Sequence, residues 1–162
     1  MREPLVFLPG LVCDARLYGP QTADLSREHA VMVAPVSEGE RIEEIASNVL
    51  DVLPKRCALV GWGLGGIVAM EVIRRAPDRV TRLCLMSTTP LSETPQQAAE
   101  RDPKIIRVRA GKYDEVIREE YHADLVMPGP YRSEILDLVE DMARGQGAEC
   151  FVRQSRALQR RK

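Results

Sequence analysis

Apolar residues in the first half of the chain form short continuous runs separated by longer amphipathic stretches. The short runs lie at residues 5–8, 30–34, 57–60 and 80–86, and each ends at proline, glycine or a polar turn. Continuous apolar runs of this length are typical of strands that are buried on both faces. We therefore predict four strands at these positions.

The segments between these strands carry apolar residues at helical spacing. Residues 42–53 form one continuous apolar stripe, with two glutamates in the first turn and Pro54 at the end. A second helix is expected over residues 64–76 and a short one within residues 17–25. Strands joined through helices pair in parallel by right-handed crossovers. The pattern predicts an α/β fold with about four parallel strands, covered by helices on both faces.

After Pro90 the pattern changes to helices alone. We expect one helix to begin at Asp102-Pro103, because aspartate is a favoured N-cap and proline a favoured first residue. Ser133 is the expected cap of a later helix. The remaining apolar stripes at helical spacing lie in residues 113–121, 135–142 and 148–160.

The change of pattern predicts two units, an α/β core of residues 1–90 and a helical cap of residues 91–162. The hydrophobic content of 44% and the charged content of 29% are typical of a soluble globular protein. The formal net charge of −1 gives no electrostatic reason to expect binding to nucleic acid or to an anionic membrane. No apolar run approaches the ~20 residues that a membrane helix needs.

The cysteines and histidines favour a reducing compartment and no metal. The four cysteines have no Cys-x-x-Cys spacing, which is typical of reduced structural thiols. The start of the chain runs directly into the first strand, so we expect no signal peptide and a cytoplasmic location. The two histidines lie far from any cysteine, and we expect no metal or other cofactor.

A glycine-rich turn joins the third predicted strand to the following helix. Residues 60–66 read Val-Gly-Trp-Gly-Leu-Gly-Gly. Two mechanisms use such a turn. The nucleophile elbow, Gly-x-Ser-x-Gly, raises a serine above the end of a sheet. The dinucleotide fingerprint, Gly-x-Gly-x-x-Gly, brings a pyrophosphate to a helix N-terminus. The segment fits both patterns, with Gly63 at the position of the elbow serine.

The dinucleotide interpretation is the weaker of the two. It requires an acidic residue at the end of the next strand, where this chain has Met86-Ser87-Thr88. Asp78 precedes that strand and is expected at the opposite end of the sheet. Trp62 would also crowd a backbone that must meet a phosphate. A Rossmann-like domain therefore stays a less favoured alternative.

Two backbone N–H groups fit the elbow interpretation. Acyl transfer needs two donors aimed at the negative charge that develops on the substrate oxygen. The residue after the elbow position supplies one donor, here Leu64. The second comes from the loop after an earlier strand, and we assign it to Leu11 in Pro9-Gly10-Leu11. Parallel strands end at one edge, so we expect both donors at one site.

The ordered set of motifs resembles the α/β-hydrolase superfamily. The matching segments are residues 5–11, 60–66, 75–80 and 83–88. The helical part after residue 90 is similar to the cap or lid of that superfamily. The resemblance implies a small esterase-like or lactonase-like hydrolase that acts on acyl substrates.

The sequence departs from that superfamily in ways that remove chemistry. The resemblance implies a serine, or occasionally Asp or Cys, as nucleophile, and this chain has Gly63 there. Glycine can form no covalent intermediate. The resemblance also implies an acid and a histidine after the cap, and the sequence ends at Lys162 before either. We therefore expect a truncated α/β-hydrolase fold that is catalytically impaired.

Local residues offer weak substitutes for these groups. Cys13 lies in the loop of Leu11, but nothing in the sequence lowers its pKa, so we expect an inert thiol. His122 stands among acids and is expected to be solvated, and His29 is expected at the opposite end of the sheet. Residues 87–89 (Ser-Thr-Thr) are expected to line a pocket or to start a turn.

The fourth strand suggests how the chain interacts with others. If the chain supplies no further strand, Val80–Met86 is left as an open apolar edge, which is a template for pairing. We expect this edge to pair with a second copy or a partner chain, or the helices to fold back over it. Two functions compete with that of an impaired hydrolase. One is a non-catalytic module for a small acyl or carboxylate ligand, and the other is an interaction protein such as half of a split enzyme.

Overall fold

A parallel β-sheet of four strands forms the centre of the molecule in the computed structural model, which describes residues 2–162. The strand order is β2-β1-β3-β4, and all three pairings are parallel. This arrangement confirms the predicted α/β fold. The strands are β1 (Leu5–Leu8), β2 (Val31–Val33), β3 (Cys57–Trp62) and β4 (Val80–Met86).

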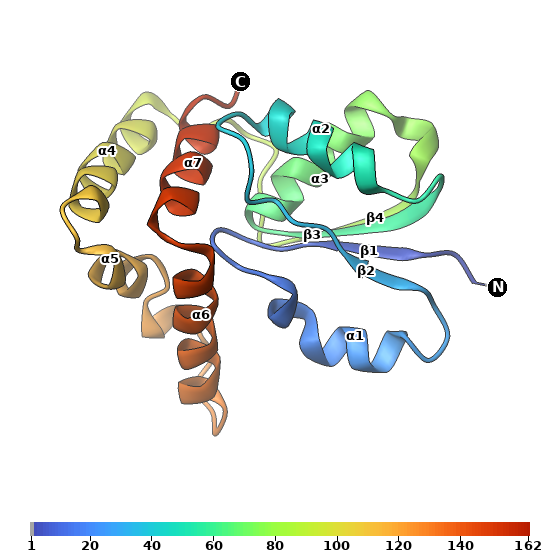
Figure 1. The fold of residues 1–162 in the computed structure, drawn as a ribbon, viewed down its shortest axis with the longest axis horizontal. Helices are drawn as coiled ribbons and strands as arrows, with labels where there is room; N and C mark the ends of the chain where they lie inside the picture. The colour runs from blue at the N-terminus through green and yellow to red at the C-terminus, as the bar shows by residue number, and fades with distance from the viewer. Residues whose placement is uncertain (1) are drawn as a thin grey trace.

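Helices cover the two faces of the sheet unequally (Figure 1). Helix α1 (Gly19–Leu25) lies on one face, after the 3-10 turn η1 (Ala15–Tyr18), and α2 (Ile42–Val52) and α3 (Leu64–Arg75) lie on the other. Residues 81–86 of β4 are exposed. The expectation of cover on both faces is therefore wrong for β4. The helices that follow β4 lie beyond the carboxyl ends of the strands (Figure 1).

The second half of the described chain is helical and gathers at the carboxyl ends of the strands (Figure 1). One apolar cluster contains residues of both halves, for example Val6 and Leu59 with Ile105 and Phe151. The division into units of residues 1–90 and 91–162 stays a prediction, and residue 1 lies outside the described part of the chain.

None of the helices in residues 2–162 has the length and apolar character that a membrane span needs. The elements are the 3-10 turn η2 (Pro77–Arg79) before β4, and then α4 (Pro95–Arg109), α5 (Tyr113–Glu120), η3 (Ala123–Leu125), α6 (Arg132–Gln146) and α7 (Ala148–Gln159).

Helix α4 begins earlier than predicted. Its N-cap is Thr94, whose Oγ1 accepts a hydrogen bond from the Gln97 amide at 3.2 Å, while Gln97 Oε1 accepts from the Thr94 amide at 2.9 Å. This capping box starts the helix at Pro95, and Pro103 lies inside it. The prediction of a start at Asp102 is wrong, because the Asp102 carboxylate accepts hydrogen bonds from α7 instead of capping α4.

The predicted cap of α6 is also wrong. The helix begins at Arg132 after Tyr131, so Ser133 lies in its first turn. No side chain caps this end of the helix. Gly147, with φ of 87°, ends α6 and leads into α7.

Candidate functional site

The bend between β3 and α3 has the geometry that the sequence predicts for a strand-to-helix elbow. Gly63 stands at its apex with φ of 56° and ψ of −119°. Its amide donates a 3.0 Å hydrogen bond to the carbonyl of Met86, and its carbonyl accepts from Thr88 Oγ1 at 2.8 Å. The bend is therefore fixed to the carboxyl end of β4.

Close packing requires most of the glycines at this bend, but not the one at its apex. A Cβ atom on Gly61 would lie 2.6 Å from the Gly66 amide nitrogen, and one on Gly65 would overlap the Leu8 carbonyl. Apart from Gly63 itself and its two neighbours in the chain, a Cβ atom on Gly63 would meet no heavy atom of the described residues within 4 Å. The apex position thus has room for a side chain that this sequence does not supply.

The loop after β1 reaches the same site. Gly10 packs so closely against the Trp62 ring that a Cβ atom would overlap it. Leu11 follows and lines the same cavity as Gly63 and Leu64. Neither the Leu11 nor the Leu64 amide finds an acceptor among residues 2–162. The two predicted donors thus border one cavity, and their role as an oxyanion hole stays a prediction.

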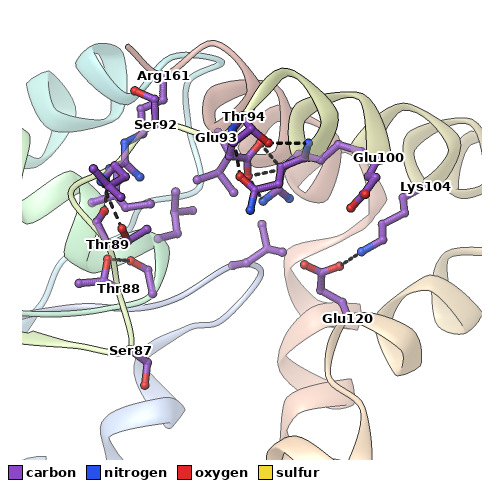
Figure 2. A pocket seen from close by; sticks show the side chains of 18 residues that line it. Ser87, Thr88, Thr89, Ser92, Glu93, Thr94, Glu100, Lys104, Glu120 and Arg161 are labelled. Carbon is purple, nitrogen blue, oxygen red and sulfur yellow. Dashed lines mark hydrogen bonds and ion pairs between the residues drawn. The ribbon is translucent and has the colours of Figure 1, made fainter.

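The cavity has a volume of about 610 Å³ and lies between the bend, the end of β4, α4 and the end of α7 (Figure 2). Ser87, Thr88 and Thr89 line it, which confirms the expectation that they border a pocket. Ser87 has a positive φ of 47°, a conformation that serine rarely adopts. The apolar part of the lining consists of Leu11, Leu64, Ile67, Leu91 and Leu158.

Paired charges form the wall of the cavity on the helical side. Figure 2 shows the Lys104 and Glu120 side chains pointing toward one another. Lys104 Nζ lies 2.6 Å from a carboxylate oxygen of Glu120, and Arg101 forms an ion pair with Glu93. The Arg101 and Glu93 side chains are each only 17% exposed. The sequence pattern alone did not predict this charged wall. Arg101 and Lys104 lie three residues apart, which places them on one face of α4. This spacing could have predicted two neighbouring cations at the site.

Two side chains of the helical half hold the loop after β1, and neither was predicted from the sequence. The Tyr121 hydroxyl donates a 2.6 Å hydrogen bond to the Leu11 carbonyl. The Gln154 side chain accepts from the Val12 amide at 2.7 Å and donates to the Val36 carbonyl at 2.9 Å. Gln154 interrupts the apolar stripe of α7, and a buried side-chain amide needs hydrogen-bond partners. This feature of the sequence could have indicated that Gln154 binds another segment.

The other candidate residues lie where they offer no base or nucleophile to the cavity. Burial raises the pKa of the Cys13 thiol from 9.0 to about 11, so the thiol is protonated at neutral pH. His29 Nδ1 lies 2.8 Å from the carbonyl of Glu3, before the start of β1. His122 is exposed, and its Nδ1 accepts from the Asp124 amide at 3.3 Å. Neither histidine lines the cavity.

The fold matches that of solved hydrolases. A thermophilic esterase from Thermogutta terrifontis, with malate bound, aligns with 99% of this chain and 64% of its own chain, with a TM-score of 0.83 and 18% identity. The enol-lactonase from Burkholderia xenovorans LB400 aligns with 99% of this chain and 66% of its own, with a TM-score of 0.79 and 20% identity. The chain has the α/β-hydrolase fold, over about two thirds of the length of these enzymes.

Sequence comparison agrees with this fold, because the chain also resembles esterases in sequence over part of its length. It is similar to the pimeloyl-[acyl-carrier protein] methyl ester esterase of Nitrosospira multiformis, with 42% identity over 59 residues, which are 35% of this chain and 22% of that enzyme. The enzyme of the same name from Aromatoleum aromaticum is 39% identical over 64 residues, which are 39% of this chain and 26% of that enzyme. The matched segments thus span about a quarter of these relatives. No protein-family model matches the chain.

Proposed function

We propose that this chain is a catalytically impaired relative of the esterases that binds an acyl or carboxylate group without hydrolysing it. The observation that carries the proposal is Gly63 at the apex of the bend, beside a cavity with room for a side chain. Acyl transfer at an elbow requires a side-chain nucleophile activated by a base. Glycine has no such group, and neither histidine of the chain lines the cavity.

The ligand class follows from what lines the cavity. Two backbone amides, of Leu11 and Leu64, border it without an acceptor in the described chain, and five apolar side chains line it beside polar and charged ones. A carboxylate can accept both N–H groups while a short apolar chain occupies the rest of the cavity. The names of the curated relatives support an acyl ligand, because those enzymes act on a pimeloyl ester.

Titration with sodium hexanoate tests this function. We expect the ¹⁵N–¹H signals of Leu11 and Leu64 to shift with hexanoate and not with hexanol, which has the same chain without the carboxylate. We also expect hydrolysis of p-nitrophenyl butyrate at the buffer rate. Hydrolysis clearly above the buffer rate, or Leu11 and Leu64 amide signals that do not shift with hexanoate, would contradict the proposal.

We further propose that the free edge of β4 pairs with another strand, from a second copy or from a partner chain such as the other half of a split enzyme. The sheet ends at β4, and its residues Leu83 and Leu85 are 37% and 39% exposed. An apolar edge strand with unpaired backbone groups favours the addition of a strand. An interaction role is thus the second candidate function.

A reducing compartment such as the cytoplasm is the location that we propose. All four cysteines, which lie within the described residues, are unpaired. Three of them are buried, where a thiol packs as a small apolar side chain. Unpaired thiols of this kind are typical of reducing compartments.

A further inference from the structure

The loop after β1 forms a tight turn whose central peptide is held at both ends. The Cys13 amide donates a 3.1 Å hydrogen bond to the Gly10 carbonyl, which closes a four-residue turn around Leu11 and Val12. Tyr121 binds the carbonyl of the central peptide, and Gln154 binds its N–H group. Both side chains come from the helical half, more than a hundred residues away in the sequence.

The conformation of this turn is one that its sequence disfavours. Val12, the third residue of the turn, has φ of 48°. Type II turns have a positive φ at this position and usually place glycine there, whereas valine favours the type I form with the central peptide flipped. Val12 is fully buried, and the contacts around it must hold the strained form.

The two side chains are themselves fixed. Gln154 is 1% exposed and uses both ends of its amide, since it also donates to Val36 in the loop after β2. Tyr121 stacks on the Trp62 ring at a centroid distance of 6.3 Å, next to Gly10. Neither side chain can turn away from the loop without losing buried hydrogen bonds or ring contacts.

We propose that Tyr121 and Gln154 are positioning residues, which hold the Leu11–Val12 peptide and so keep the Leu11 N–H directed at the cavity. The Gly10 carbonyl points into the turn, where it accepts the hydrogen bond from the Cys13 amide. In a trans peptide the N–H group points opposite to the carbonyl, so the Leu11 N–H points out of the turn. The Leu11 N–H is thereby left free for a ligand. This inference rests on the proposed carboxylate binding at Leu11 and Leu64.

Two pairs of matched variants separate this role from a general contribution to stability. Tyr121→Phe removes the hydroxyl that binds the loop, and Tyr113→Phe removes a hydroxyl that donates an equal 2.6 Å bond to the Ala143 carbonyl, away from the loop. Gln154→Leu is matched by Gln159→Leu, because Gln159 on the same helix donates to the Ala98 carbonyl. The readouts are hydrogen exchange of the Val12 amide and the affinity for hexanoate, both by NMR.

We expect Val12 exchange to be at least tenfold faster in Tyr121→Phe than in Tyr113→Phe, and hexanoate affinity to fall about tenfold in Tyr121→Phe alone. Gln154→Leu should show both effects and Gln159→Leu neither. Equal Val12 exchange within each pair, or unchanged affinity with a loosened turn, would overturn the inference. If the NMR signal of the Leu11 amide in the wild-type protein does not shift with hexanoate, the proposed carboxylate site is refuted, and the positioning role with it.

Discussion

The hydroxyl of Thr88 donates a 2.8 Å hydrogen bond to the carbonyl oxygen of Gly63 and so joins the end of β4 to the apex of the bend. The Gly63 amide is bound on the same side, by the Met86 carbonyl. These contacts use only the backbone of residue 63. The bend therefore keeps its shape with glycine at the apex.

Gly63→Ser should fold and remain inactive. The new side chain has room, but a residue with a Cβ atom at φ of 56° and ψ of −119° is strained, which costs about 1–3 kcal/mol in the free energy of unfolding. Hydrolysis of p-nitrophenyl butyrate should not rise, because a serine hydroxyl without a base is a weak nucleophile. Urea denaturation and initial rates check the two parts.

The matched control is Gly65→Ser, at a glycine of the same bend. Its Cβ atom would overlap the Leu8 carbonyl, so this variant should lose more than ~3 kcal/mol or fail to fold. Equal stability of the two serine variants would show that the packing described around Gly65 is wrong.

Thr94→Ala should destabilise the protein, and Ser133→Ala should not. Thr94 caps α4 within a capping box, and removing such a cap costs about 1 kcal/mol. Ser133 lies in the first turn of α6 without a capping role, so its removal should change the free energy of unfolding by less than ~0.5 kcal/mol. Chemical denaturation of both variants measures the difference. A larger decrease in the free energy of unfolding for Ser133→Ala would indicate that Ser133 caps α6, as the sequence predicts.

Leu85→Lys should weaken self-association or partner binding through β4. A charge on an exposed edge strand opposes the addition of another strand. Light scattering over a range of concentrations should show a larger species for the wild-type chain and a smaller one for this variant. Ile106→Lys is the control, since Ile106 is 67% exposed on α4, away from the sheet edge. A wild-type chain that stays monomeric at every concentration, and that co-purifies with no partner, would contradict the proposal.

Stability should fall between about pH 9 and pH 11, in part through Cys13. Burial raises the pKa of this thiol from 9.0 to about 11, so its contribution is present below pH 9 and is lost as the pH rises through 11. The loss is about 2 kcal/mol for this group. Cys13→Ala should reduce the decline by that amount when denaturation is measured over a series of pH values. An identical decline in the wild-type protein and the variant would rule out this origin.

Local patterns were enough for most of the elements and for the bend. The four strands and the helices α2 and α3 were predicted because periodicity and chain-breaking residues act over a few neighbours. The start of α4 was predicted at the wrong residue, because Thr94 and Asp102 are both residues that favour an N-cap. Thr94 caps the helix through a capping box, whereas the Asp102 carboxylate binds Arg156 of α7.

The glycines around residue 63, by themselves, determined a bend with no nucleophile at its apex, since that chemistry depends on residue identity alone. Only the tertiary structure decided what holds the neighbouring loop and what stays uncovered. Tyr121 and Gln154 reach Leu11 and Val12 across more than a hundred residues, and β4 is exposed because the helices that follow it pack elsewhere. Such contacts depend on the path of the whole chain, and no local pattern encodes it.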